Sequence, residues 1–271
     1  MSLLDDRIRI GMGQMRVEGG ALDENLARAV EMIEAASGEG CDLLVLPECL
    51  DAGWTDPSAR TIASPIPGGT SRVLSCAARE HGLYLVAGIT ERQQESIFNT
   101  AVLIGPDGAI LGKHRKINEL EIAMGLYGLG SGLHAAHTPI GTIGLTICAD
   151  NAPGSLHFAH SLARMGVQLF PSPCAWAVDG DHDNRTDPYG EMWLTAYWQI
   201  ARRYRATVVG VSNVGPITGG PWAGRKCIGC SLAIGPDGEV LAQGAYDVED
   251  LIAFDATLCP VTGWGTGFGP T

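Results

Sequence analysis

The chain has 271 residues, of which 45% are hydrophobic and 18% are charged, and this composition is typical of a folded globular protein with a sizeable core. The formal net charge of -12 argues against nucleic-acid binding, because binding to phosphates needs clustered Lys and Arg side chains. No apolar run reaches the roughly eighteen residues of a membrane-spanning helix, so we expect no interaction with a membrane.

The N-terminal sequence Met-Ser-Leu-Leu-Asp-Asp-Arg (1–7) lacks the basic start and the apolar stretch of a secretory signal. Eight cysteines in a chain without such a signal indicate thiols that stay reduced rather than a disulfide framework. We therefore expect a cytoplasmic protein.

Strands and helices alternate through the first half of the chain. Residues 22–36 predict a helix, because their apolar side chains recur at helical spacing and Gly38 and Gly40 then follow as stop signals. A second helix is predicted to end at Gly82. Apolar runs predict three strands around these helices, at residues 8–12, 43–46 and 83–88.

The second half repeats the order of the first. Leu-Ile-Gly-Pro-Asp-Gly-Ala-Ile-Leu (103–111) recurs as Ala-Ile-Gly-Pro-Asp-Gly-Glu-Val-Leu (233–241), and each segment predicts a hairpin with a Pro-Asp-Gly turn. Upstream of the second copy the same succession of elements is predicted, with strands at 143–148, 167–170 and 207–211 and helices at 155–165 and 193–205.

Each half thus predicts a mixed α/β sheet that helices cover on one face. The other face also needs burial, and the sheet of the other half is the simplest partner. We expect a four-layer α-β-β-α sandwich with internal pseudo-twofold symmetry, in which residues 1–271 form one domain. Two separate α/β domains are the alternative, although no polar linker divides the halves. The glycine-rich stretches at 125–132 and 215–224 predict loops over a site, and the tail at 263–269 is either loose or ordered by a partner subunit.

Three chemically useful residues stand where apolar runs end, namely Glu48, Lys116 and Cys148. Brought together, they would supply a general acid/base, a cation for an oxyanion and a thiol nucleophile. The turn after Cys148 would also direct the backbone N–H of Ala149 toward the oxyanion. Taken singly, each residue is common at a strand end, so the prediction depends on all three converging.

Together the three resemble the catalytic residues of the nitrilase superfamily of carbon–nitrogen hydrolases. Leu-Pro-Glu (46–48), Arg-Lys-Ile (115–117) and Gly-Leu-Thr-Ile-Cys-Ala-Asp (144–150) match the three catalytic motifs of that family in order. Gly-Cys-Ser (229–231) also resembles a recurrent segment of the family. The family has the α-β-β-α fold that the internal repeat predicts.

The resemblance implies a role for each residue. Glu48 would accept the Cys148 proton, pass it to the leaving amine and then activate water, while Lys116 and the Ala149 N–H would stabilise the oxyanion. Many members carry a second glutamate soon after the lysine. Glu119 and Glu121 compete for that position here, and Glu119 is preferred because Ile-Asn-Glu follows the lysine directly.

The segment after the nucleophile favours an amide or carbamoyl substrate. The nitrile-cleaving branch typically has Trp-Glu directly after the cysteine, whereas this chain has Ala149-Asp150. Amidase-like branches often have Pro-Glu a few residues further on, and here Pro153-Gly154 keeps only the proline. A nitrilase and a catalytically silent scaffold of the same fold are the alternatives.

The remaining expectations concern the pocket, the partners and cofactors. Substrate contacts are predicted for Trp176, Trp54, Tyr127 and Asn151. Homo-oligomers are common in the family, so we expect at least a dimer. No cofactor or metal is expected, because His157 and His160 lack the glutamate of a His-Glu-x-x-His site and the acidic run 179–183 departs from a calcium loop.

Overall fold

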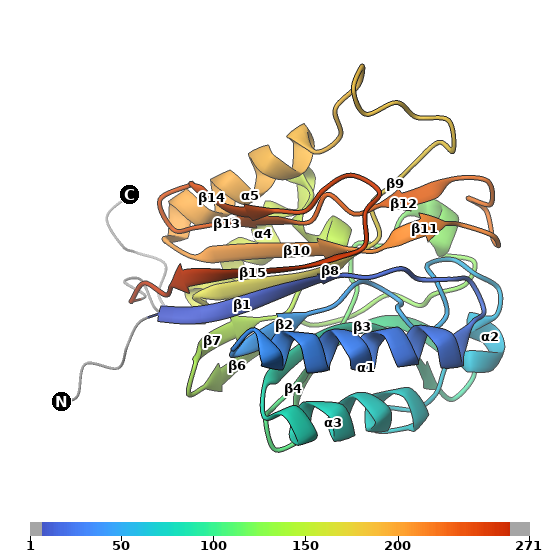
Figure 1. Ribbon diagram of the computed structural model, residues 1–271, viewed down its shortest axis with the longest axis horizontal. Coiled ribbons are helices and arrows are strands. Elements are labelled where there is room, and N and C mark those ends of the chain that lie inside the picture. The colour runs from blue at the N-terminus through green and yellow to red at the C-terminus, as the bar shows by residue number, and fades with distance from the viewer. Residues whose placement is uncertain (1–6, 261–271) are drawn as a thin grey trace.

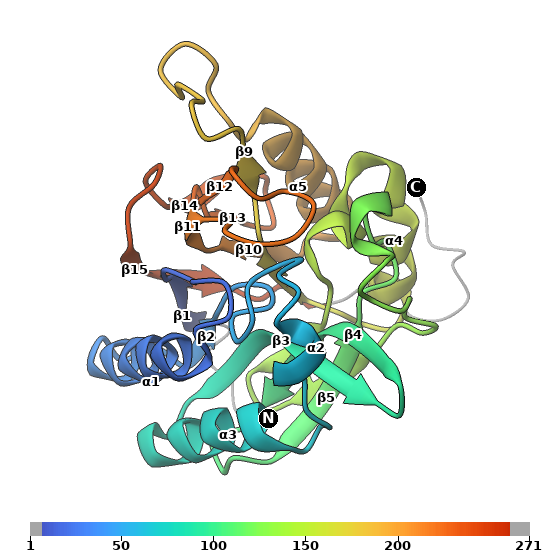
Figure 2. The same ribbon diagram turned by 90° about the vertical axis from the view of Figure 1, so that its right-hand side faces the viewer.

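Two six-stranded sheets pack face to face in the protein, and helices cover the outer face of each (Figures 1 and 2). The computed structural model describes residues 7–260, so the tail at 263–269 lies outside the described residues. Within that range no helix is long and apolar enough to cross a membrane.

The first sheet comes mainly from the first half of the chain. Its strand order is β15-β1-β2-β3-β4-β5, with β1, β2 and β3 parallel and the other neighbours antiparallel. The helices α1 and α3 lie on its outer face. The elements are β1 (Arg7–Gln14), α1 (Leu22–Gly38), β2 (Leu43–Val45), α2 (Ala59–Ile62), α3 (Gly69–His81), β3 (Tyr84–Gln93), β4 (Ser96–Ile104), β5 (Ile110–Arg115) and β15 (Asp250–Thr257).

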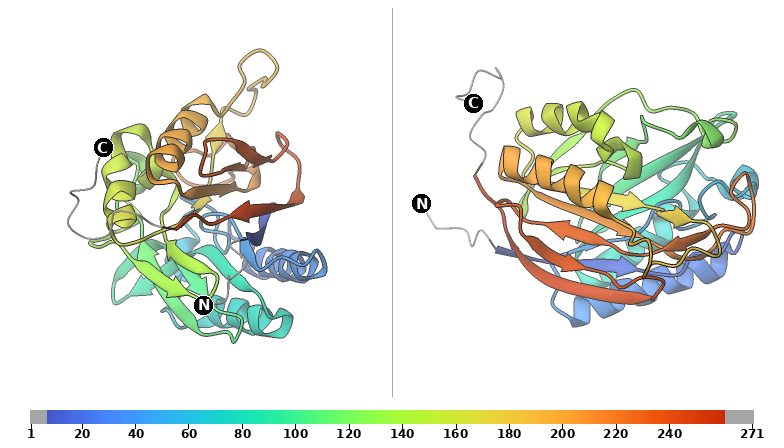
Figure 3. Two further views of the ribbon diagram at one scale, coloured as in Figure 1. Left: turned by 90° about the vertical axis from the view of Figure 1, so that its left-hand side faces the viewer. Right: turned by 90° about the horizontal axis from the view of Figure 1, so that it is seen from above.

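The second sheet has the order β14-β13-β10-β8-β7-β6. The helices α4 and α5 lie side by side over its outer face (Figure 3). The elements are β6 (Ala135–Thr138), β7 (Gly141–Gly144), α4 (Leu156–Arg164), β8 (Leu169–Cys174), α5 (Glu191–Tyr204), β10 (Thr207–Ser212), β13 (Leu232–Ile234) and β14 (Val240–Gln243).

Short elements fill the connections. A small third sheet has the order β11-β12-β9, and three 3₁₀ turns precede α4. These elements are η1 (Glu121–Ala123), η2 (Cys148–Asn151), η3 (Pro153–Ser155), β9 (Ala177–Val178), β11 (Val214–Pro216) and β12 (Lys226–Ile228). None of the strands in the third sheet was predicted, because two or three residues are too few to show an alternating pattern.

The sandwich and its internal symmetry are confirmed. The strands β1, β2, β3, β4 and β5 correspond in order to β7, β8, β10, β13 and β14, and β15 and β6 are the matching antiparallel outer neighbours of β1 and β7. Even the hairpins agree in detail. A bulge separates Leu103 from Ile104 and Ala233 from Ile234, and both turns place a glycine, Gly108 and Gly238, at positive φ.

Three hydrophobic clusters separate the four layers. One lies under α1 and α3, one lies under α4 and α5, and the third fills the space between the sheets. The third cluster takes Val45 and Val86 from the first sheet and Leu169 and Val209 from the second, all fully buried. Burial of such a side chain contributes roughly 1.5–3 kcal/mol, so the inter-sheet layer holds the two halves together.

The predicted strand at 143–148 is too long at its C-terminal end. Strand β7 stops at Gly144, and Cys148 opens the turn η2 instead. The reason is local: the Ile147 N–H donates to the carboxylate of Asp150 rather than to a neighbouring strand. The nucleophile candidate therefore stands on a turn, four residues beyond the last residue of β7.

Candidate active site

Glu48 is placed by a loop that reaches from the first sheet to the second. It follows Pro47 beyond the end of β2, and its N–H donates to the carbonyl of Cys174 at the end of β8, at 3.2 Å. Strand β3 passes closely beneath: a Cβ on Gly88 would lie 2.6 Å from the Cα of Glu48. Glycine at position 88 thus allows this approach, and the Glu48 side chain is 1% exposed.

Lys116 lies next to Glu48 in the same buried space. Its Nζ is 2.6 Å from Oε1 of Glu48 and 3.7 Å from Oε2 of Glu119. Asn99 of β4 donates to the same Glu48 oxygen at 2.6 Å. Burial alone would lower the pKa of Lys116, but the charges of Glu48 and Glu119 outweigh it and hold that pKa well above its ordinary value. Lys116 is therefore a permanent cation.

Glu119, rather than Glu121, accompanies the lysine. Glu119 is 4% exposed, and burial raises its pKa to about 7, although Lys116 acts in the opposite direction. Glu121 begins η1 and is exposed to solvent. The expectation that Glu121 competes for the site is wrong, because the chain turns at Leu120 and carries the next carboxylate outward.

Cys148 has a backbone conformation that a side chain rarely adopts. Its φ is 41°, in the left-handed region, and such strained positions are found at functional sites. Its N–H donates to Oγ of Ser172 at 3.0 Å, which ties the turn to β8. A hydrogen bond with the Cys174 thiol, burial and the charge of Glu48 raise the pKa of Cys148 well above its ordinary value, whereas Lys116 lowers it. The resting thiol is thus protonated and needs a base.

The turn leaves one backbone donor free. The Ala149 N–H makes no hydrogen bond within residues 7–260, while the N–H groups on either side of it, of Cys148 and Asp150, are both occupied. A free N–H directly after a nucleophile is the donor that an oxyanion requires.

Two of the predicted pocket residues lie beside this cluster. The ring of Trp54 has its centroid 5.7 Å from the Lys116 Nζ, and it forms a T-shaped contact with the ring of Trp222. The Tyr127 hydroxyl accepts a hydrogen bond from the Thr55 N–H at 3.3 Å. Both predicted residues are almost fully buried, so they border the buried cluster and do not lie on the protein surface.

The other two predicted pocket residues are also buried, and Trp176 lines a second cavity of about 400 Å³ together with Tyr189 and Trp193. Trp176 stacks on Trp193, with ring centroids 5.1 Å apart, in the core beneath α5. Asn151 is fully buried and donates to Oγ1 of Thr146 at 2.9 Å. Nε1 of Trp176 and Oδ1 of Asn151 have no partner among the described residues.

Sequence reasoning missed Asn99 and His114, and gave Asp150 no role. Asn99 had one signal, since it is a polar residue inside an apolar strand that proves fully buried. His114 and Asp150 had none, because their contact joins segments 36 residues apart.

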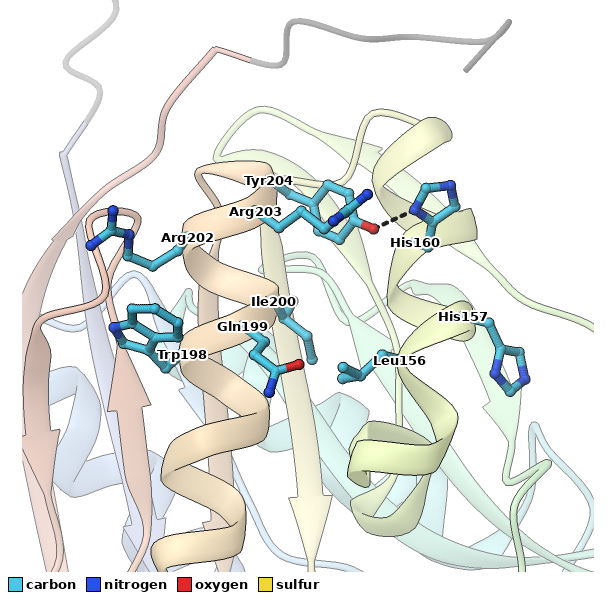
Figure 4. A pocket seen from close by; sticks show the side chains of 9 residues that line it. All are labelled: Leu156, His157, His160, Trp198, Gln199, Ile200, Arg202, Arg203 and Tyr204. Carbon is cyan, nitrogen blue, oxygen red and sulfur yellow. Dashed lines mark hydrogen bonds between the residues drawn. The ribbon is translucent and has the colours of Figure 1, made fainter. Parts of the chain in front are cut away.

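A separate surface groove of about 640 Å³ lies between α4 and α5 (Figure 4). None of the residues of the candidate active site lines this groove. Two histidines, two arginines and Trp198 give it a mixed aromatic and basic lining. The full set is Leu156, His157, His160, Trp198, Gln199, Ile200, Arg202, Arg203 and Tyr204.

Comparison with known families agrees with this geometry. The family model described as carbon-nitrogen hydrolase matches residues 9–264. The chain belongs to the carbon-nitrogen hydrolase family. The superfamily and its enzyme class, predicted from three short motifs, are thereby confirmed.

Individual members of the family match over most of their length. The chain is 30% identical to omega-amidase NIT2 of Danio rerio, over 93% of this chain and 89% of that protein. It is 31% identical to a nitrilase of Pyrococcus abyssi, over 90% and 87% respectively. Its fold superposes on a carbon-nitrogen hydrolase from Helicobacter pylori G27 with a TM-score of 0.84 and 21% identity, over 93% of this chain and 90% of that one.

Proposed function

We propose that this carbon-nitrogen hydrolase cleaves a small amide through a thioester on Cys148. The observation that carries the proposal is the buried cluster in which Lys116 contacts Glu48 and Glu119 beside the thiol. Amide rather than nitrile cleavage is supported by the omega-amidases among the relatives and by Ala149-Asp150 after the nucleophile.

The first half of the reaction forms the thioester. Glu48 accepts the Sγ proton of Cys148, and the thiolate attacks the amide carbonyl carbon. The oxygen becomes an oxyanion that Lys116 Nζ and the Ala149 N–H stabilise. Glu48 then gives its proton to the amide nitrogen, the C–N bond breaks, and ammonia or an amine leaves.

The second half regenerates the thiol. Glu48 takes a proton from water, whose oxygen attacks the thioester carbonyl. The C–S bond breaks, the carboxylic acid leaves, and the proton on Glu48 returns to Sγ of Cys148. Each proton taken is thus returned, so the cycle consumes only the amide and water.

Glu119 holds the lysine and does not take part in proton transfer in this proposal. Its carboxylate is 3.7 Å from the Lys116 Nζ, and Oε1 and Oε2 have no hydrogen-bond partner among residues 7–260. An unpaired carboxyl group in a buried site is available to a substrate amide N–H. We assign Glu119 to orient both Lys116 and the substrate.

The test is hydrolysis by wild type and by Cys148→Ala across amides, carbamoyl compounds and the matching nitriles. We expect ammonia release from amides by the wild type, none by the variant, and unchanged melting of the variant. Mass spectrometry should find an acyl adduct on Cys148. Activity retained by Cys148→Ala would refute the mechanism, preference for nitriles would favour a nitrilase, and an unreactive Cys148 would favour a silent scaffold.

We also propose a homo-oligomer built on the face of α4 and α5. Three large apolar side chains on α5 are exposed, Met192 at 48%, Leu194 at 42% and Trp198 at 45%, and Trp198 also lines the groove of Figure 4. Contiguous apolar surface favours association, and Leu194 and Trp198, which are four residues apart on the helix, are neighbours on its surface. Light scattering at micromolar concentration should give at least a dimer, and Trp198→Glu should reduce it to a monomer. Val73→Glu, on the outer face of α3, is the control.

Two further proposals concern the whole protein. The halves share the inter-sheet core and the site, which supports a single domain over residues 1–271. All eight cysteines are free thiols, which supports a reducing compartment such as the cytoplasm. A single cooperative unfolding transition would support the single domain, and cell fractionation would test the cytoplasmic location.

A further inference from the structure

Asp150 has an unusually complete set of hydrogen bonds for a buried carboxylate. Oδ2 accepts from the Ile147 N–H at 3.1 Å and lies 2.8 Å from Nε2 of His114. Oδ1 accepts from the N–H groups of Ile117 at 3.2 Å and Asn118 at 2.9 Å. The side chains of Asp150 and His114 are 1% and 0% exposed.

These four donors come from the two segments that carry the reactive groups. Ile147 belongs to the turn of the nucleophile, next to Cys148. The other three flank Lys116, which lies between His114 and Ile117 in the chain. A further bond runs the opposite way, from Nδ2 of Asn118 to the Ala149 carbonyl at 2.7 Å.

The carboxylate faces a side of the lysine segment that the first sheet does not hold. On the other side, the Lys116 N–H donates to the Asn99 carbonyl at 2.9 Å, and its carbonyl accepts from Gly130 at 2.8 Å. Both of these partners belong to the first half of the chain. Among residues 7–260, the hydrogen bonds between residues 114–119 and the Cys148 turn all involve Asp150 or Asn118.

We propose that Asp150, with His114, is a positioning residue that sets the separation of Lys116 and Glu119 from Cys148. This inference rests on the proposed amide hydrolysis. A carboxylate suits the task because it offers about four acceptor sites and no donor, and all four are used here. An apolar contact would fill the same volume without fixing the direction or register of either segment.

The two residues differ in what they can be replaced by. Asp150→Asn keeps the volume but turns an NH₂ group toward at least one backbone N–H, so at least one hydrogen bond is lost and a repulsion is added. His114→Phe removes only the side-chain donor. His114→Gln keeps an N–H that can reach the carboxylate, and so it is the conservative variant.

The experiment compares these variants with a matched control on the same sheet. Gln168→Ala removes a side chain that bridges the Thr142 N–H and the Cys259 carbonyl, at the opposite end of β8 from Cys174. For each protein we would measure the melting temperature, kcat, KM and the rate at which iodoacetamide alkylates Cys148. The alkylation is monitored by mass spectrometry of the peptide that contains Cys148.

We expect Asp150→Asn to lower kcat by about 10- to 100-fold with little change in KM, since small displacements of reacting groups have effects of that size. Its Cys148 should be alkylated about 10-fold more slowly, because withdrawal of Lys116 reduces the thiolate fraction. His114→Phe should lower kcat and the alkylation rate by smaller factors than Asp150→Asn. His114→Gln should have values of both closer to those of the wild type. Gln168→Ala should melt earlier with unchanged kcat.

Wild-type kcat and alkylation in folded Asp150→Asn would overturn the inference. So would a loss of activity that matches the unfolded fraction while the folded protein keeps the wild-type alkylation rate. The alkylation rate needs no substrate. If no amide is hydrolysed, the proposed function fails, and slower alkylation in Asp150→Asn but not in Gln168→Ala would still support positioning.

Discussion

The ammonium of Lys116 and the carboxylate of Glu48 form an ion pair with an Nζ–Oε1 distance of 2.6 Å, and each side chain is 1% exposed. Two charges this deeply buried are stable only as a pair, because each alone would bear a desolvation cost that nothing offsets. The pair thus holds an ammonium and a carboxylate beside Cys148.

Lys116→Met should destabilise the protein by roughly 3–5 kcal/mol, because it leaves a buried charge unpaired. It should also abolish amide hydrolysis. The double variant Lys116→Met/Glu48→Gln should recover part of the stability and none of the activity. Chemical denaturation of the wild type, both single variants and the double variant measures this coupling. A double variant whose loss of stability equals the sum of the two single losses would show that the pair does not interact.

Glu119 should make the folded state less stable as the pH rises. Burial raises its pKa from 4.5 to about 7, so between these values the folded state holds more protons than the unfolded state. The difference in pKa corresponds to roughly 3 kcal/mol of folding stability. This contribution is present at pH 4.5 and is lost by about pH 7. The free energy of unfolding, measured by denaturation between pH 5 and 8, should depend less on pH in Glu119→Gln than in the wild type. An identical slope in both proteins would contradict the buried, protonated carboxyl.

Gly88→Ala should disturb the site from below. The new Cβ would lie 2.6 Å from the Glu48 Cα and 2.7 Å from the Pro47 carbonyl oxygen, both backbone atoms. We expect a loss of about 1–3 kcal/mol and a fall in kcat as Glu48 moves. Gly38→Ala is the control, since no atom lies within 4 Å of its Cβ, and it should keep full activity. Wild-type kcat in Gly88→Ala would show that Glu48 tolerates displacement.

Asn99→Leu should reduce kcat on the order of 10-fold, about 1.4 kcal/mol, because Glu48 loses the donor at 2.6 Å that orients it. Asn99→Asp should be worse, since it places a third carboxylate beside Glu48 and Glu119. Steady-state kinetics of the two variants, with melting as the control for folding, checks the order. Activity equal to wild type in both would remove Asn99 from the site.

Strand-end patterns and the internal repeat were sufficient to predict the sandwich and to nominate Glu48, Lys116 and Cys148. They could not predict Asn99, because its contact with Glu48 depends on the register of β4 against β5 and on a loop from β2. The choice between Glu119 and Glu121 depended on the turn at η1, which a few residues of polar sequence do not specify. Convergence of side chains from different loops is a property of the folded chain.

The strand β15 pairs with a strand from the other half of the chain, and this pairing links the two halves. It belongs to the second half in sequence, yet it pairs along the whole of β1 in the first sheet. In the same way β6, which follows β5 as β15 follows β14, pairs with β7, the first strand of the second half. Glu48 and Lys116 come from the first half and Cys148 from the second. Each half therefore contributes one edge strand to the sheet of the other half, and this reciprocal exchange joins the half that carries Glu48 and Lys116 to the half that carries Cys148.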